Sequence, residues 1–151
     1  KGAPDWVNEG TQAVSDKNGQ LIQGIGMAAP MNDSSLQKST ADNRARAEVA
    51  RVLSTYIDST ISDYSSSSGG NNSSSVARDI RSATKLALNG AIIKGNWKDK
   101  KTGNIYSFAE LDMEKVDKAI EATASMNENF KRYFSEKSNA NFDRFVKDNQ
   151  Q

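Results

Sequence analysis

The feature that most constrains the fold is a regular stripe of apolar side chains that begins at residue 41 and ends at residue 64. Its members recur every three or four positions, which is the spacing that places side chains on one face of an α-helix. Ser34 and Gln37, just upstream, have the spacing of a capping box, which predicts that the helix begins there. The stripe consists of Ala41, Ala45, Val49, Val52, Leu53, Tyr56, Ile57, Ile61 and Tyr64. We therefore expect one helix of about eight turns with a single buried face.

Two pairs of strand candidates lie on either side of this helix in the sequence, residues 11–16 with 20–28 and residues 91–97 with 105–111. An Asn-Gly dipeptide separates the first pair, and Asn-Gly between apolar stretches is typical of a tight β-hairpin turn. Strands that follow one another directly favour an antiparallel sheet with helices on one face. The predicted fold class is α+β, an antiparallel sheet of two hairpins packed in two layers against two to three helices.

Two further helices are expected. Residues 76–88 have helical apolar spacing, and Asp112 can cap a final helix. One face of that final helix would carry Met113, Val116, Ile120, Thr123, Asn127, Phe130 and Phe134.

The remaining segments complete the expected domain organisation. Residues 65–75 contain only Ser, Gly and Asn after Tyr64, a composition that predicts a flexible loop. Residues 1–10 form a lead-in with one large anchor, Trp6. We expect a single α+β domain over residues 11–137 and a helical tail over residues 138–151.

The composition limits both the core and the chemistry. Leu, Ile, Val and Phe together number only 27 of 151 residues, which predicts a lean core with alanines where helices pack closely. The chain contains no His and no Cys, which excludes Cys/His zinc sites, iron–sulfur clusters, His-dependent hydrolysis and disulfides. A net charge of +1 gives no global attraction to nucleic acid, and no apolar run is long enough to span a membrane. We expect no cofactor and no metal.

One glycine motif has two interpretations. Residues 24–29, with the sequence GIGMAA, match the G-x-G-x-x-A pattern of a dinucleotide-binding turn. That turn must lead directly into a helix, whereas Pro30 and a polar stretch intervene here. We favour the second interpretation, in which Gly24 and Gly26 let another backbone or helix approach a strand closely.

Three carboxylates also have two interpretations. Glu110, Asp112 and Glu114 could act together in acid–base catalysis. Asp112 is better explained as a helix cap, and Glu114 as an acidic residue in the first helical turn. We therefore predict no catalytic residue and no enzymatic activity.

The basic hairpin tip is the candidate for nucleic-acid binding. Lys98, Lys100 and Lys101 lie beside Trp97 and Tyr106, two rings on which bases could stack. The near-neutral charge of the chain favours the other interpretation, a charged tip that keeps the sheet edge from aggregating.

Aromatic residues are the candidates for contacts with other proteins. An aromatic set near the C-terminus has helical spacing, which is typical of a core. In a chain so poor in large aliphatic residues, the same set could equally pack on another subunit. The candidate interaction residues are Tyr133, Phe134, Phe142 and Phe145, followed by Trp97 and Tyr106.

Several stretches together resemble one bacterial family. They are PDWV at residues 4–7, a strand that ends in GIGMA, ADNRARAEVARVLSTYI at residues 41–57, and W-x-D followed by TGxIYSFAELD within residues 97–112. In order and spacing they are similar to the Lpp-twenty lipoproteins, small envelope lipoproteins that include the flagellum-associated FlgP-type proteins. The match extends from residue 4 to about residue 125.

The resemblance implies a secreted α+β domain held at the outer membrane by a lipidated Cys that would precede Lys1. The chain begins without an initiator Met, so we interpret it as a mature fragment. Some members of the family assemble into rings or discs around the flagellar motor, and the family has no known catalytic residues to carry over. The insert at residues 65–75 and the long aromatic C-terminus depart from the family pattern.

We therefore expect a non-enzymatic domain of the bacterial cell envelope, on the periplasmic side or the surface of the outer membrane. It would act as a structural and protein-interaction module, able to self-assemble or to associate with the flagellum. Its expected partners are other envelope proteins or copies of itself, and the membrane through the lipid anchor, with no nucleic acid. The alternative is a periplasmic module that binds a small molecule or glycan in a cleft beside Trp97 and Tyr106.

Overall fold

The computed structural model describes residues 2–68 and 73–149 and shows an α+β fold. Four strands form one antiparallel sheet in the order β1-β2-β4-β3. The strands are β1 (Gln12–Asp16), β2 (Gly19–Ala28), β3 (Ile92–Lys98) and β4 (Ile105–Asp112). The helices described are α1 (Asp5–Glu9), α2 (Ser34–Ser68), α3 (Ser73–Leu88), α4 (Met113–Ala122) and α5 (Glu128–Asp148).

Both predicted hairpins are confirmed. β1 and β2 meet at a tight turn in which Asp16 pairs with Gly19, and Gly19 has a positive φ of 117°. β3 and β4 form the second hairpin, and β2 pairs with β4 along its length from Leu21–Asp112 to Ala28–Ile105. The two hairpins therefore join through their inner strands, which leaves β1 and β3 at the sheet edges.

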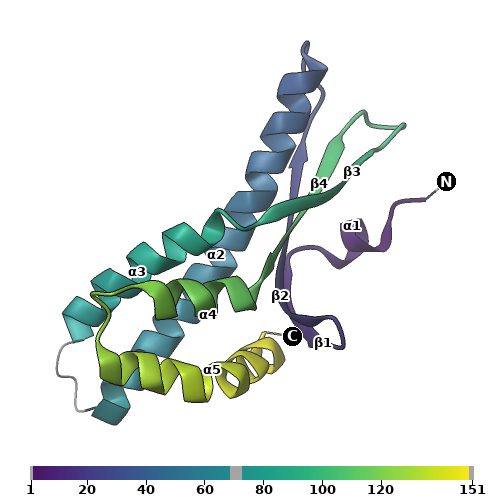
Figure 1. Ribbon diagram of the computed structural model, residues 1–151. Coiled ribbons are helices and arrows are strands. Elements are labelled where there is room, and N and C mark those ends of the chain that lie inside the picture. Colours follow the sequence, from purple (N-terminus) through teal and green to yellow (C-terminus); the bar gives the residue numbers. More distant parts are fainter. Residues whose placement is uncertain (1, 69–72, 150–151) are drawn as a thin grey trace.

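The glycine motif packs β2 against α2. A Cβ on Gly24 would lie 2.9 Å from both the backbone nitrogen and a methyl of Val49, and one on Gly26 would lie 2.7 Å from the carbonyl carbon of Arg44. Real Cβ atoms essentially never come that close to backbone. The structure thus supports close packing of a helix on the strand, and the long helix covers this face of the sheet (Figure 1).

The long helix is confirmed and begins at Ser34 as predicted, but its cap differs and its end is later than predicted. Asp33, not Ser34, provides the cap, because its carboxylate accepts a hydrogen bond from the Leu36 amide at 3.1 Å. Gln37 closes no capping box, since its side chain donates to the carbonyls of Ala28 and Gly103.

The expected flexible loop at residues 65–75 is largely helical where the structure describes it. α2 continues through Ser68, and α3 begins at Ser73. The middle of the expected loop, residues 69–72, lies outside the described residues. A helix that is already formed adds residues at little cost, so α2 extends beyond its last apolar position, and the Ser67 hydroxyl donates to the Tyr64 carbonyl.

The expected final helix is two helices. Asp112 caps α4 by accepting from the Glu114 amide, as predicted. The chain leaves the helix at Thr123, and Asn127 starts α5 by accepting from the Phe130 amide. Asn127 is therefore a cap and not a member of a continuous helical face. α5 runs without interruption through residue 138, where the tail was expected to begin.

The molecule has a narrow end and a wide end (Figure 1). α3 and α5 pack against the C-terminal half of α2, and α4 packs against α3 and α5; most of the large core side chains lie in this part. The N-terminal part of α2 and the β3–β4 hairpin extend beyond these helices. We call this part, residues 27–44 and 96–107, the narrow end.

Candidate functional site at the narrow end

Trp97 and Tyr106 lie together on the sheet face opposite α2. They are direct partners across β3 and β4, with ring centroids 5.6 Å apart, and both are partly buried. Met27 pairs with Tyr106 from β2 on the other side and is 39% exposed. Since Gly26 and Ser107 point towards α2, their neighbours Met27 and Tyr106 point away from it. The three side chains form one row across the sheet.

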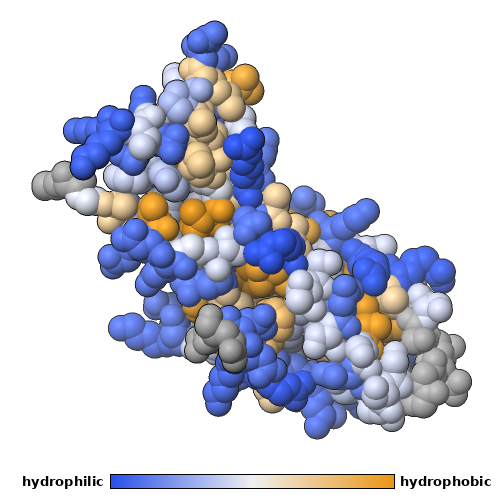
Figure 2. All heavy atoms as spheres, turned by 180° about the vertical axis from the view of Figure 1, so that it is seen from behind, coloured by the Kyte–Doolittle hydropathy of each residue, from blue (hydrophilic) through white to orange (hydrophobic). Residues whose placement is uncertain are grey.

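Two further apolar side chains are exposed where β2 connects to α2. Met31 is 38% exposed in the connecting loop, and Leu36 is 55% exposed in the first turn of α2. Figure 2 shows hydrophobic side chains at this end of the molecule next to hydrophilic ones. Exposed side chains of this size, gathered at one end, indicate a contact surface.

The β3–β4 turn adds positive charge to this end. Lys98, Lys100 and Lys101 are exposed there, and they line a cleft of 810 Å³ with Trp97 and with Gly2 and Ala3 of the N-terminal segment. Asp99 is engaged within the turn, where its carboxylate accepts from the Lys101 amide at 2.9 Å.

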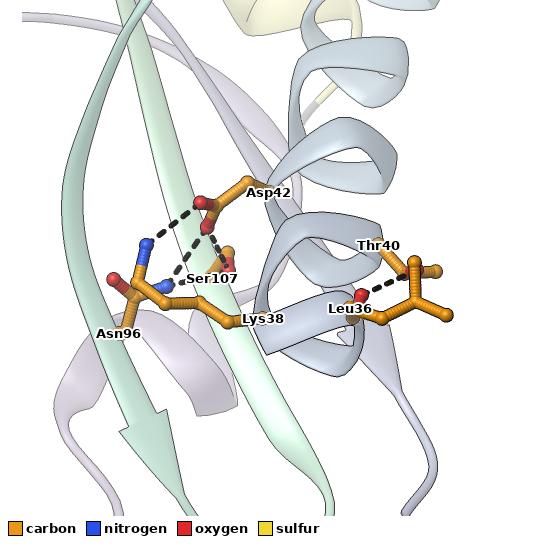
Figure 3. Close-up of polar contacts among 6 residues, drawn as sticks. All are labelled: Leu36, Lys38, Thr40, Asp42, Asn96 and Ser107. Carbon is orange, nitrogen blue, oxygen red and sulfur yellow. Dashed lines mark hydrogen bonds and ion pairs between the residues drawn. The ribbon is translucent and has the colours of Figure 1, made fainter. Parts of the chain in front are cut away.

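A cluster of four polar side chains fixes the narrow end to the sheet (Figure 3). The Asp42 carboxylate accepts from the Ser107 hydroxyl at 2.6 Å, from the Asn96 amide at 2.9 Å and from the Lys38 ammonium at 2.9 Å. Asn96 also donates to the Ser107 oxygen at 2.7 Å. Burial alone would raise the pKa of Asp42, but these hydrogen bonds outweigh burial and hold the pKa below its usual value. The cluster therefore contains a carboxylate ion that joins α2 to β3 and β4.

Ser107 is fully buried, which decides what the cluster can do. A nucleophilic Ser must reach its substrate, and a hydroxyl with no exposed surface that already donates to Asp42 is held in the interior. The cluster therefore holds α2 rigidly on β3 and β4, and its hydroxyl is not accessible to a substrate.

The first-ranked interaction candidates lie in or beside the protein's own core. Phe134 and Phe142 are buried, and Phe142 packs edge-on against Tyr56 of α2 with centroids 5.2 Å apart. Tyr133 and Phe145 are partly buried and pack against the same core. Tyr133, Phe142 and Phe145 hold α5 on α2. Phe134 lies between α4 and α5, and in this structure Phe134 and Phe142 are not available to a second subunit.

Trp6 acts as an anchor, as the sequence suggested. Its ring stacks on Phe108 of β4 with centroids 5.4 Å apart, and it approaches the place where a Cβ on Gly95 would lie. α1 therefore covers the centre of the sheet face opposite α2 and leaves the row of Met27, Tyr106 and Trp97 beside it.

Of the three carboxylates considered for catalysis, Glu110 and Asp112 line a common cleft of 490 Å³, and Glu114 does not line it. Glu110 accepts from the Gln23 side chain at 3.0 Å, and Glu114 pairs with Lys118 at 3.1 Å. Among the described residues, no group of three or more Asp or Glu side chains has the arrangement needed to hold a metal ion.

The strongest perturbation of a carboxylate is at Asp117, in a cleft of 540 Å³ between α4 and α5. Burial, supported by the negative charges of Glu114, Asp112 and Glu121, raises the pKa of Asp117 to about 6. Lys131 and Arg132 line the same cleft, which makes its charge mixed.

Sequence reasoning found Trp97, Tyr106 and the lysines but missed Met31, Leu36 and the Asp42 cluster. Leu36 carries a usable signal, because one turn before Ala41 the buried stripe reaches Gln37, which is buried. Leu36 is one position off that stripe, which turns its side chain by about 100° from the buried face and leaves it on an exposed flank of the helix. The Asp42 cluster joins residues more than 50 positions apart and leaves no local signal.

Comparisons with known proteins identify no relative. No family profile, no curated protein and no solved structure matches this chain. In the part of the chain that the structure describes, no helix has the length and apolar character to cross a membrane.

Proposed function

We propose that this chain is a non-enzymatic structural domain of the bacterial cell envelope that contacts other proteins and copies of itself. The observation that carries the proposal is the free edge of the sheet at β3. The order of motifs that resembles the Lpp-twenty lipoproteins supports the location. On that resemblance, a lipidated residue upstream of Lys1 holds the domain at the outer membrane, and association with the flagellum is one use of such a domain.

β3 presents an unpaired row of backbone groups. It is the last strand of the order β1-β2-β4-β3, so within the described residues it pairs with β4 alone. Ile92, at its start, is 53% exposed. A free strand edge is a template for pairing with another strand, and two copies of β3 can pair antiparallel about a two-fold axis.

Two features of β3 limit how strongly it pairs. Its register shifts between Ile93 and Gly95, and Lys94 and Lys98 add positive charge. Bulges and lysines at sheet edges oppose uncontrolled association. We therefore expect a weak and reversible dimer that becomes stable when a partner raises the local concentration.

Sedimentation equilibrium over a range of concentrations tests the self-association. We expect the Ile92→Lys variant to dissociate at a concentration at least about tenfold higher than the wild type, since it adds a charge at the paired edge. Leu86→Lys is the matched control, because Leu86 is 63% exposed on α3 and lies outside the sheet. A wild type that stays monomeric at the highest concentration, or equal effects of both variants, would contradict the proposal.

A second candidate function has one specific observation in its favour. The cleft beside Trp97 has a volume of 810 Å³, within the range of small-molecule sites. Binding of a small molecule or glycan there would change the fluorescence of Trp97. A Trp97→Phe variant that removes the signal would support this function, and a screen of sugars and metabolites without a saturable change would exclude it.

A further inference from the structure

We propose that the narrow end binds the surface of an anionic phospholipid bilayer. Met27, Met31 and Leu36 would enter the interface between headgroups and acyl chains. The lysines of the β3–β4 turn would contact the anionic headgroups. This contact is separate from self-association through β3 and from any lipid attached to the chain.

Exposed apolar side chains are concentrated at this end. Among the described residues, five large hydrophobic side chains are exposed, and three of them are Met27, Met31 and Leu36. Met27 is one residue from the end of β2, and Leu36 is the third residue of α2. Met31 lies in the loop that connects these two elements, so all three side chains lie near the tip, as insertion into the headgroup region requires.

The charge of the narrow end complements an anionic surface. Five cationic side chains at this end oppose three acidic ones, a formal charge of +2 in a chain with +1 overall. The cationic residues are Lys38, Arg44, Lys98, Lys100 and Lys101, and the acidic ones are Asp33, Asp42 and Asp99.

The acidic groups are all engaged within the protein. Asp33 caps α2, Asp42 accepts from Lys38 and its other partners, and Asp99 accepts from a backbone amide of the turn. Lys98, Lys100 and Lys101 are exposed and make no ion pair within the described residues. Each Lys or Arg near the surface of an anionic bilayer strengthens binding to it about fivefold through electrostatic attraction.

The aromatic pair lies at the corresponding depth. Trp97 is one residue from the end of β3, and Tyr106 is one residue from the start of β4. Trp and Tyr rings are enriched at membrane–water interfaces, because one part of each ring system is apolar and the other forms hydrogen bonds.

The directions of the apolar side chains favour a fluid partner over a folded one. Leu36 projects from α2 on the side away from Asp42 and the sheet (Figure 3). Met27 projects from the other face of the sheet, the one opposite α2. A protein partner would need to enclose the tip from both sides, whereas a lipid interface surrounds an inserted tip without a shaped surface.

Co-sedimentation with vesicles tests the proposal. The wild-type chain, without any attached lipid, is mixed with two kinds of vesicle. One kind is pure phosphatidylcholine, and in the other about one third of the lipid is phosphatidylglycerol. We expect binding to the anionic vesicles that weakens as salt is raised. Binding should fall at least about tenfold for Lys100→Glu/Lys101→Glu, and several-fold for Met31→Gln/Leu36→Gln.

Matched variants keep the test specific. Lys17→Glu/Lys137→Glu changes the net charge equally at exposed positions outside the narrow end, and Leu86→Gln removes an exposed leucine from α3. Both should bind like the wild type, and circular dichroism should show that every variant is folded. Ile92→Lys, which addresses self-association, should also bind vesicles normally, so the two proposals can fail separately. No binding by the wild type, equal binding to both vesicle types, or equal losses in the controls would overturn the proposal, and a protein partner would then be the remaining occupant.

Discussion

Gly24 sets the distance between β2 and α2. Its missing side chain leaves room for the backbone of α2, and a Cβ there would lie 2.9 Å from the Val49 nitrogen. We expect Gly24→Ala to lower the free energy of unfolding by about 2 kcal/mol or more, because neither backbone can move aside without losing its packing. Chemical denaturation measures the change.

Gly95→Ala is the control for this prediction. A Cβ at Gly95 would meet only the Trp6 ring, at 3.8 Å, which is ordinary van der Waals contact. Equal stability losses for the two variants would show that close approach of α2 is not the reason for Gly24.

Asp117 should destabilise the protein at neutral pH. Its folded pKa of about 6 lies above the unfolded value near 3.8, so folding disfavours the charged form. The penalty is absent below about pH 4, grows as the pH rises through about 6, and is then constant. We expect Asp117→Asn to stabilise the protein at pH 7 by about 1 to 2 kcal/mol, a range that allows for solvent screening, and to have no effect near pH 3.5.

Thermal or chemical unfolding at the two pH values measures this difference. Glu136→Gln on α5 removes an exposed charge of the same sign and serves as the control. A stabilisation by Asp117→Asn that does not depend on pH would show that the carboxyl charge is not the cause.

At the scale of elements, the Asp42 cluster determines how the start of α2 is attached to β3 and β4. We expect Asp42→Ala to cost about 1.5 to 3 kcal/mol, because hydrogen bonds to a charged group are lost and the buried Ser107 loses its acceptor. The pKa of Asp42 is lowered on folding, so this contribution is complete above the unfolded pKa and is lost as the pH falls through the folded value.

Asp58→Ala on the same helix is the matched control. Asp58 pairs with Arg81 at 3.2 Å, but both side chains are 56% exposed, and exposed ion pairs contribute little. If Asp42→Ala cost no more than Asp58→Ala in urea denaturation at pH 7, the cluster would not stabilise the attachment.

The elements were largely predictable because their signals are local. The Asn-Gly turn, the stripe of α2 and the Asp112 cap each depend on residues a few positions apart, and the structure confirms them. The break between α4 and α5 was missed, because Thr123 and Asn127 continue the three- and four-residue spacing. Asn127 was the available signal, because Asn is a common helix cap. Its side chain accepts from the Phe130 amide, which in a continuous helix would donate to a backbone carbonyl instead.

At the scale of the whole molecule, sequence patterns could not say which surface remains free. The spacing of Phe134 and Phe142 fits both a core and an interface, and the packing of α5 on α2 decides for the core. Met31 and Leu36 become a surface feature only because the hairpin turn and the start of α2 lie at the same end. Such information depends on how elements far apart in the sequence are placed, which local patterns do not contain.

α2 belongs to both ends of the molecule, so we expect the ends to unfold together. Its N-terminal half packs on the sheet at Gly24 and Gly26, and its C-terminal half holds Tyr56 against Phe142 of α5. Both tryptophans, Trp6 and Trp97, lie on the sheet, whereas circular dichroism at 222 nm is dominated by the helices. Fluorescence therefore reports mainly on the sheet, and circular dichroism mainly on the helices, including α2 along its whole length.

The urea transitions seen by tryptophan fluorescence and by circular dichroism should coincide. Phe142→Ala removes a buried ring that packs on Tyr56, whereas the tryptophans pack on Phe108 and Tyr106, and it should cost about 3 to 5 kcal/mol. If α2 couples the ends, this variant lowers the fluorescence midpoint as much as the dichroism midpoint, although no tryptophan contacts the altered site. The contrary result is a fluorescence transition that stays at the wild-type midpoint while the dichroism transition moves to lower urea. In that case α2 would lose its C-terminal packing without releasing the sheet, and the two ends would be separate folding units.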